Sequence, residues 1–371
     1  MIPDRIARAD DAFYDVSQSL HFVTINPTNS HLVRKDFMKT KVDPKFTYHD
    51  KPTHLSRKIA IIKDFQFKNE PIDQIFKDKQ QELLNKCRLY ANIGKEKFTS
   101  FSKKVWGRPD KKLIDVAYDI LDLDDSPKQE NISSKASLFL LKDALREYRI
   151  HNLWRIEKMD RTTSAAAVRY HEKVLSLKKK ERFSKKYIQR LIVHEVGTHI
   201  LRYENSLIQP LKILRVGLSD YLTTEEGLAA YNENENDLLS KTVLRQYAGR
   251  VVAVDLSLKN SFTDTFKELR RSFDADSAFK LALRTKRGIS DSSLAGGCTK
   301  DYVYLKGYLQ VQDYIESGNS YEDLYIGKVG IENISVIKKI PEIRPARFIP
   351  HPIEQMSINS FVENVPLMPG E

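Results

Sequence analysis

Cysteine is scarce in this chain of 371 residues, which contains only Cys87 and Cys298. Two cysteines so far apart form neither a disulfide framework nor a multi-cysteine zinc site, so a reducing compartment is expected. The sequence also lacks an apolar run long enough to cross a bilayer. Residues 1–5 lack the basic region followed by an apolar stretch that marks a secretory signal. These absences predict a cytoplasmic protein without a membrane span.

Acidic residues are fewer than basic ones, which leaves a formal net charge of +11. Such an excess favours acidic partners, whether nucleic acid, an anionic membrane surface or acidic polypeptide tails. Zinc-finger spacing and recognisable nucleic-acid motifs are missing, so nucleic-acid binding remains only an alternative. Part of the excess is clustered within residues 178–186, where a solvated loop is the simplest interpretation.

Apolar sequence is plentiful, because 41% of the residues are hydrophobic and can bury a substantial core. The length suits one large domain or two modest ones. We predict a mostly helical N-terminal region over residues 1–130, a catalytic domain over 131–345 and an extended tail over 346–371. The polar stretch 122–133, which contains a proline, is the best linker candidate.

The spacing of apolar residues predicts both helices and strands. Ser184 can cap a helix that starts near Lys185. A strand just before that helix can hold an extended peptide along an exposed edge, or it can be an ordinary edge strand. Residues 58–66 are too short to classify. Helices are expected over residues 4–20, 71–91 (with a proline in the first turn), 97–104, 111–121, 134–148 and from 223 to about 260, and strands over 164–168 and 173–177.

Residues 193–199, Val-His-Glu-Val-Gly-Thr-His, form the motif with the clearest chemistry. In the well-known zinc-peptidase helix two histidines four residues apart share one face, and the glutamate between them is the general base. Here His194 and His199 are five apart, which places them about 140° apart in a regular α-helix. A π-bulge or local unwinding would bring the imidazoles together. Gly197, which lies between them, supplies backbone freedom for that distortion.

A third ligand is available in Glu226, because catalytic zinc commonly has three protein ligands and His₂Glu is one known set. Glu195 would then take a proton from water as it attacks a carbonyl. The spacing Thr223-x-x-Glu226 is also that of a capping box, which gives Glu226 a purely structural alternative. The neighbouring Glu225 competes for either role.

These residues carry a resemblance to the tyrosine-carboxypeptidase family. That family includes microtubule-associated detyrosinases and bacterial relatives known as flavohaemoglobin-expression-modulating QEGLP-motif proteins. The specific part is the HExxxH element with its downstream Glu-Glu-Gly-Leu segment, and the similarity covers about residues 20 to 345. The matching segments are His194–His199, Gln209-Pro210, Thr224–Ala229, Asn26–Asn29, Pro44-x-Phe46-x-Tyr48 and Cys298–Tyr304.

By resemblance, His194, His199 and Glu226 bind Zn²⁺ and Glu195 is the catalytic base. The bacterial relatives usually have glutamine where Glu225 stands, which favours Glu226 as the ligand. The resemblance also implies an α+β, zincin-like fold, with a small twisted sheet packed on the metal-binding helix. Additional helices, within residues 1–125 and 235–320, are expected to surround that core.

The resemblance further implies a carboxypeptidase that favours an aromatic C-terminal residue in the eukaryotic members. Such an enzyme needs a cation for the terminal carboxylate and a hydrogen-bond donor for the developing oxyanion. Arg287 or Lys300 is proposed as the carboxylate clamp, Tyr304 as the oxyanion donor and Arg202 as a further substrate-binding residue. For each of these, a surface or structural role is the competing interpretation.

The sequence therefore predicts a zinc-dependent metallopeptidase, a carboxypeptidase that acts on polypeptide C-termini, with acidic tails as suitable substrates. The first competing class is a catalytically silent zinc-binding regulator of the same fold. The second is a basic nucleic-acid-binding protein, which the net charge alone motivates.

Overall fold

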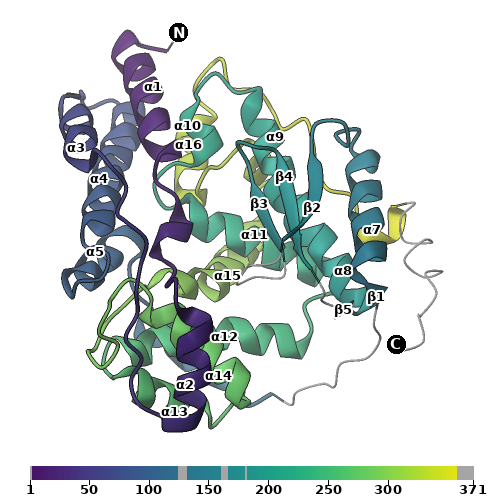
Figure 1. Ribbon diagram of the computed structural model, residues 1–371. Coiled ribbons are helices and arrows are strands. Elements are labelled where there is room, and N and C mark those ends of the chain that lie inside the picture. Colours follow the sequence, from purple (N-terminus) through teal and green to yellow (C-terminus); the bar gives the residue numbers. More distant parts are fainter. Residues whose placement is uncertain (1, 124–131, 160–165, 180–181, 357–371) are drawn as a thin grey trace.

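The computed structural model describes residues 2–123, 132–159, 166–179 and 182–356, which form a mostly helical α+β fold (Figure 1). Five helices expected from apolar spacing are present with closely similar bounds. Of residues 58–66, which the pattern left unclassified, residues 58–63 belong to a helix as well. The N-terminal elements are α1 (Asp4–Gln18), η1 (Phe22–Ile25), α2 (Ser30–Thr40), α3 (Leu55–Lys63), α4 (Pro71–Ala91), α5 (Lys97–Trp106), α6 (Lys111–Leu121) and α7 (Ser134–Glu147).

The main sheet has three strands in the order β2-β4-β3, with β2 and β4 parallel and β3 antiparallel to β4. The strand expected over 173–177 is the central one, so the edges of the sheet are β2 and β3 rather than this strand. The first part of the strand expected over 164–168 lies outside the described residues. The strands are β2 (Arg155–Met159), β3 (Ala166–Arg169) and β4 (Val174–Lys178), with a separate pair of β1 (Ile132–Ser133) and β5 (Arg182–Phe183).

The helix after the sheet starts as expected, since the Ser184 side chain accepts a hydrogen bond of 3.1 Å from the backbone N–H of Tyr187. It then changes register and continues as a π-helix through the histidine motif before it returns to α-helix. The elements are α8 (Lys185–Leu191), the π-helix η2 (Ile192–Ile200), α9 (Leu201–Leu207) and α10 (Ile213–Val216).

The single long helix expected from residue 223 to about 260 is wrong, because the chain forms two helices there. Asp237 has a left-handed φ of 55°, and Ser240 caps the second helix by accepting a hydrogen bond from Val243 N. The remaining elements are α11 (Tyr221–Glu235), α12 (Lys241–Ser257), α13 (Phe262–Leu269), α14 (Ala275–Lys286), η3 (Lys300–Tyr302), α15 (Val303–Glu316), η4 (Glu322–Tyr325), α16 (Ile331–Ile337) and η5 (Ile353–Gln355).

Helix α11 lies between two hydrophobic clusters and is close to the centre of the molecule (Figure 1). Leu228 belongs to the cluster that includes the sheet and the π-helix, whereas Ala230 belongs to the cluster of α12–α15. The same helix crosses α15 at Gly227 and Gly307, where a Cβ on Gly227 would lie 2.2 Å from the Gly307 carbonyl carbon. Only two glycines allow so close a crossing. It brings the N-terminal end of α15 beside the first turns of α11.

The tail predicted as extended over 346–371 is described as far as residue 356. This part packs on the protein, because Phe348 N–H and Arg347 N–H both donate hydrogen bonds to the buried Asn205 side chain. Ile353 and Met356 are buried as well. Every helix in the described segments is too short or too polar to cross a lipid bilayer.

Candidate functional site

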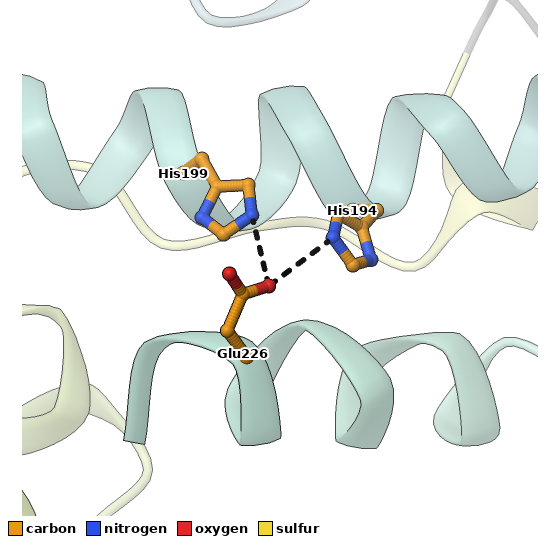
Figure 2. Close-up of side chains that lie close together, drawn as sticks. All are labelled: His194, His199 and Glu226. Carbon is orange, nitrogen blue, oxygen red and sulfur yellow. Dashed lines mark ion pairs between the residues drawn. The ribbon is translucent and has the colours of Figure 1, made fainter. Parts of the chain in front are cut away.

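The π-helix brings together the two histidines that a regular α-helix would separate. The ring centroids of His194 and His199 lie 4.9 Å apart, and both imidazoles face α11 (Figure 2). A π-helix has more residues per turn than an α-helix, so residues five apart fall on one face. The register change inferred from the spacing of the motif is therefore present.

Glu226 on α11 points at both imidazoles (Figure 2). Its Oε2 lies 3.9 Å from His194 Nε2 and 3.8 Å from His199 Nε2. The capping-box alternative is excluded, because α11 begins at Tyr221 and Thr223 already lies inside the helix. In the described part of the chain, Glu226 Oε2 is buried and has no hydrogen-bond partner. A buried oxygen without a partner is costly, so the site favours a positively charged ligand at this point.

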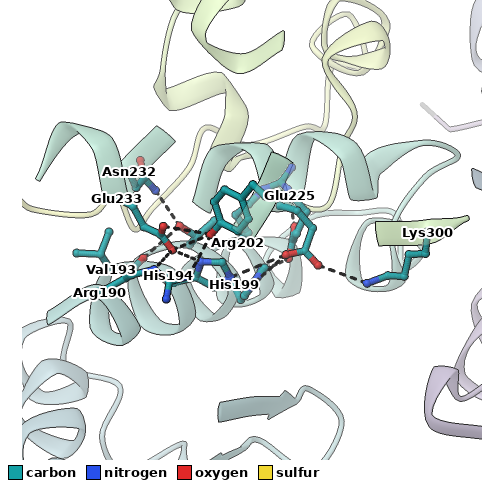
Figure 3. A network of polar contacts seen from close by, with 12 residues as sticks. Arg190, Val193, His194, His199, Arg202, Glu225, Asn232, Glu233 and Lys300 are labelled. Atoms are coloured by element: carbon teal, nitrogen blue, oxygen red, sulfur yellow. Dashed lines mark hydrogen bonds and ion pairs between the residues drawn. The ribbon is translucent and has the colours of Figure 1, made fainter. Parts of the chain in front are cut away.

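Two further carboxylates hold the opposite nitrogens of the imidazoles (Figure 3). His194 Nδ1 lies 2.7 Å from Glu233 Oε1, and His199 Nδ1 lies 3.0 Å from Glu225 Oε1. A carboxylate accepts only, so each Nδ1 is assigned as the protonated nitrogen that donates. The lone pair of each Nε2 is then directed toward Glu226. This is the arrangement in which histidines are oriented for metal binding.

These two carboxylates are themselves paired with buried cations. Glu233 forms an ion pair of 3.0 Å with Arg190 and accepts a hydrogen bond of 3.1 Å from the Tyr247 hydroxyl. Burial alone would raise the pKa of Glu233, but Arg190 and His194 together lower it. Glu225, whose carboxylate lies 3.4 Å from Lys328 Nζ, likewise has its pKa lowered against burial, by Lys328 and Arg202. We call the set the rear cluster: Arg190, Arg202, Glu225, Glu233, Tyr247 and Lys328.

Arg202 belongs to this rear cluster, which corrects its expected role in substrate binding. Its side chain is fully buried, and its guanidinium pairs with Glu225. The same guanidinium donates hydrogen bonds of 2.8 Å to the Leu324 carbonyl and 2.7 Å to the Val329 carbonyl. Three of its nitrogens are thus engaged inside the protein. Arg202 supports the carboxylate that holds His199 and does not reach a substrate.

Glu195 differs from its neighbours in the π-helix, because it is the one residue of Ile192–Ile200 that is not buried. Among the described residues its carboxylate makes no hydrogen bond. It lies close enough to His199 and Tyr170 to shift their pKa values electrostatically. Glu195 is therefore beside the histidine pair with its carboxylate available.

Helix α15 and the turn before it carry two of the predicted site residues, the carboxylate-clamp candidate Lys300 and the oxyanion-donor candidate Tyr304. Lys300 Nζ lies 3.6 Å from Glu226 Oε1. The ring of Tyr304 stacks on Tyr247, with centroids 5.4 Å apart, and Arg250 lies 4.0 Å above it. Burial raises the pKa of Tyr304, so its hydroxyl remains protonated and able to donate. We call Glu195, Glu226, Lys300 and Tyr304 the front cluster.

Arg287, the other predicted carboxylate clamp, forms its described ion pair with Asp301 and not with Glu226. Its guanidinium pairs with Asp301 at 3.0 Å and donates a hydrogen bond of 3.1 Å to Asn26 Oδ1, while its buried Nε has no partner among the described residues. Arg284 also pairs with Asp301, at 2.6 Å. Burial would raise the pKa of Asp301, but Arg284 and Arg287 hold it well below its usual range. One buried anion therefore serves at least two guanidinium groups.

Of the rear cluster, sequence reasoning identified only Glu225 and Arg202. It also assigned no role to Arg250, which lies over Tyr304, or to Arg284, which pairs with Asp301. Glu233 was detectable, because it lies seven residues after Glu226 on the same helical face. Lys328 comes from the loop before α16, and no spacing in the sequence relates it to the histidine motif. Arg190 lies four residues before His194 and resembles an ordinary solvated arginine in the sequence.

Comparison with known proteins covers most of the chain. A family model described as microtubule-associated tyrosine carboxypeptidase matches residues 35–362. A human protein named microtubule-associated tyrosine carboxypeptidase 1 is 29% identical over 179 residues, 46% of this chain and 37% of the relative. A mouse protein named putative tyrosine carboxypeptidase MATCAP2 is 30% identical over 173 residues, 44% of this chain and 32% of the relative. These alignments span about a third of each relative.

The family match extends over most of the described structure and includes the π-helix, α11 and α15. It thus contains the histidine pair, Glu226 and both clusters around them. The resemblance found in the sequence is confirmed: this chain belongs to the microtubule-associated tyrosine carboxypeptidase family.

Proposed function

We propose that this protein is a zinc-dependent carboxypeptidase with a zincin-like core. The observation that carries the proposal is Glu226 Oε2, a buried oxygen that has no hydrogen-bond partner among the described residues and faces two imidazole Nε2 atoms. Ligand atoms of His194, His199 and Glu226 all lie within 4.8 Å of one another, so one ion can reach them. Two nitrogens and one oxygen form a common donor set of catalytic zinc.

When bound, zinc supplies Lewis-acid chemistry, which polarises a carbonyl and acidifies water. Glu195 accepts the proton of the attacking water, since its carboxylate lies beside His199 and makes no hydrogen bond to a described residue. The Tyr304 hydroxyl donates a hydrogen bond to the oxyanion that develops on the scissile carbonyl. Lys300 and Arg287 bind the carboxylate of the terminal residue.

The substrate is a polypeptide C-terminus, and a tyrosine or another aromatic residue is the expected terminal one. The family description and the names of the relatives support this choice. The net charge of +11 suits acidic tails. β3, an edge strand that leads to Tyr170 beside the rear cluster, supports an extended peptide at this side of the sheet.

The test combines elemental analysis with mass spectrometry. Purified protein is expected to hold about one zinc per chain and to remove one residue from peptides that end in tyrosine. Glu195→Gln should retain the metal and lose turnover, while His194→Ala should lose both. Internal cleavage would instead indicate an endopeptidase. A protein with bound zinc and no turnover on a C-terminal peptide library would overturn the enzymatic part of the proposal.

A further inference from the structure

Phe22, on the short helix η1, contacts both cations proposed to bind the terminal carboxylate. Its ring centroid lies 4.7 Å from the Arg287 guanidinium carbon and 4.8 Å from Lys300 Nζ. Trp106 packs against the same ring in an edge-to-face geometry, with centroids 5.9 Å apart. The ring is half-buried, so part of it is open to solvent.

The segment that carries Phe22 is anchored independently of these cations. Ile25 is fully buried in a small apolar cluster with Leu89 and Phe98, which come from α4 and α5. At the end of the segment, Asn26 Oδ1 accepts a hydrogen bond of 3.1 Å from Arg287. Phe22 and Asn26 therefore approach Arg287 from a fixed support. The segment lies before residues 35–362, which the family model matches.

We propose that Phe22 is a positioning residue for the carboxylate clamp formed by Arg287 and Lys300. This inference rests on the proposed function. Two like charges held side by side repel each other, and Asp301 pairs with Arg287 but not with Lys300 among the described ion pairs. The negative face of an aromatic ring attracts both cations without neutralising either. Phe22 thus holds Arg287 and Lys300 on one ring, although their carboxylate partners differ: Asp301 for Arg287 and, at 3.6 Å, Glu226 for Lys300.

The experiment measures binding of a peptide with a C-terminal tyrosine, with a free or an amidated terminus, to Glu195→Gln protein. Binding is followed by fluorescence anisotropy, so no turnover is needed. Phe22→Leu, which keeps apolar volume but removes the ring, should weaken binding of the free terminus on the order of tenfold. Binding of the amidated peptide should change little. Phe22→Tyr, which restores a ring, should restore affinity.

Phe101→Leu is the matched control, because Lys104 lies 5.5 Å over that ring on α5, whereas the described contacts of Arg287 and Lys300 are with Phe22. This variant should bind both peptides as the parent does. In the active background, Phe22→Leu should raise KM with little change in kcat, and the zinc content should stay the same.

The inference is overturned if Phe22→Leu binds the free terminus as tightly as the parent, if it loses both peptides equally, or if the parent binds no free C-terminus. If the parent binds the free terminus more tightly than the amidated one but the active protein shows no turnover, the proposed function is wrong and the inference about Phe22 still stands. The two failures are therefore distinguishable.

Discussion

The polar groups of the rear cluster and those of the front cluster differ in how fully they are paired with other groups of the protein. In the rear cluster each carboxylate meets an imidazole and at least one buried cation. In the front cluster Glu226 Oε2 has no hydrogen-bond partner in the described chain, and Glu195 remains partly exposed. Paired groups fix positions, whereas groups with unused capacity are left to act on a ligand.

Glu225 and Glu226 test this difference most strongly, because adjacent residues of α11 belong to opposite clusters. Glu226→Gln should abolish zinc binding and turnover, since it removes a ligand charge. The free energy of unfolding of the metal-free protein should fall less than in Glu225→Gln, because Glu226 Oε2 has no hydrogen bond to a described residue and the ion pair of Oε1 with Lys300 is long, at 3.6 Å. Elemental analysis and urea unfolding in a chelator measure the two effects.

Glu225→Gln is the matched variant and should have the opposite signature. It leaves Arg202 and Lys328 without their anion, so the free energy of unfolding should fall by about 3–5 kcal/mol. Equal loss of stability in both variants would contradict the distinction between the clusters.

Tyr304→Phe has the next largest expected effect, on the front cluster alone. Loss of the hydroxyl should lower kcat roughly 10²- to 10³-fold, because the oxyanion loses its donor. Melting temperature should be unchanged, since the ring keeps its stacking on Tyr247 and under Arg250. Steady-state kinetics and thermal unfolding give the two values.

Tyr302→Phe is the control for that result, two residues away. Its hydroxyl donates a hydrogen bond of 2.6 Å to the Trp106 carbonyl, a structural contact. This variant should lose stability and keep kcat. If both tyrosine variants have the same kcat, Tyr304 is not an oxyanion donor.

Glu233→Gln should weaken zinc binding about 10- to 100-fold, because His194 loses the carboxylate that orients it. Competition with a chelator of known affinity measures this change. Glu204→Gln is the matched variant. Glu204 is also buried, but it accepts hydrogen bonds from Trp154 and Lys173 rather than from His194. It should lose stability without losing zinc affinity. If Glu233→Gln and the parent bind zinc with the same affinity, Glu233 does not position His194 for the metal.

Local patterns in the sequence were sufficient for most helices and for the distorted turn at the histidines. The five-residue spacing of His194 and His199 demanded a change of register, and the structure has one there. The error at α11 and α12 has a local cause, because favourable apolar spacing masked Asp237 and the Ser240 cap. Such turn signals were available in the sequence but were outweighed by periodicity.

The rear cluster was harder to predict from the sequence, because its charged residues come from distant segments of the chain. Lys328 and Arg202 meet at Glu225 only after the chain has folded, and a buried arginine has the same sequence context as an exposed one. The expectation that Arg202 binds substrate failed for this reason. Long-range pairing of charges follows from tertiary packing and not from any period along the chain.

Gly307→Ala should have the smallest effect on activity. It tests whether a shift of α15 affects the front cluster without affecting the zinc ligands. A Cβ at this position would lie 2.0 Å from the Thr223 carbonyl oxygen, so α15 must shift. Overpacking of this kind should lower the free energy of unfolding by about 1–3 kcal/mol. kcat should fall less than in Tyr304→Phe, because Lys300 and Tyr304 move without losing a group. Zinc content should be unchanged, since all three proposed ligands lie on the π-helix and α11.

Asp313→Ala, an exposed position on the same helix, is the control and should change neither quantity, as surface substitutions rarely exceed about 0.5 kcal/mol. Loss of zinc from Gly307→Ala would mean that α15 holds the ligands as well as the substrate groups. If zinc is retained and kcat is lowered, then only the groups of the front cluster depend on the position of α15. The close crossing of two glycines would then set the distance between a rigid ligand frame and the groups that act on substrate.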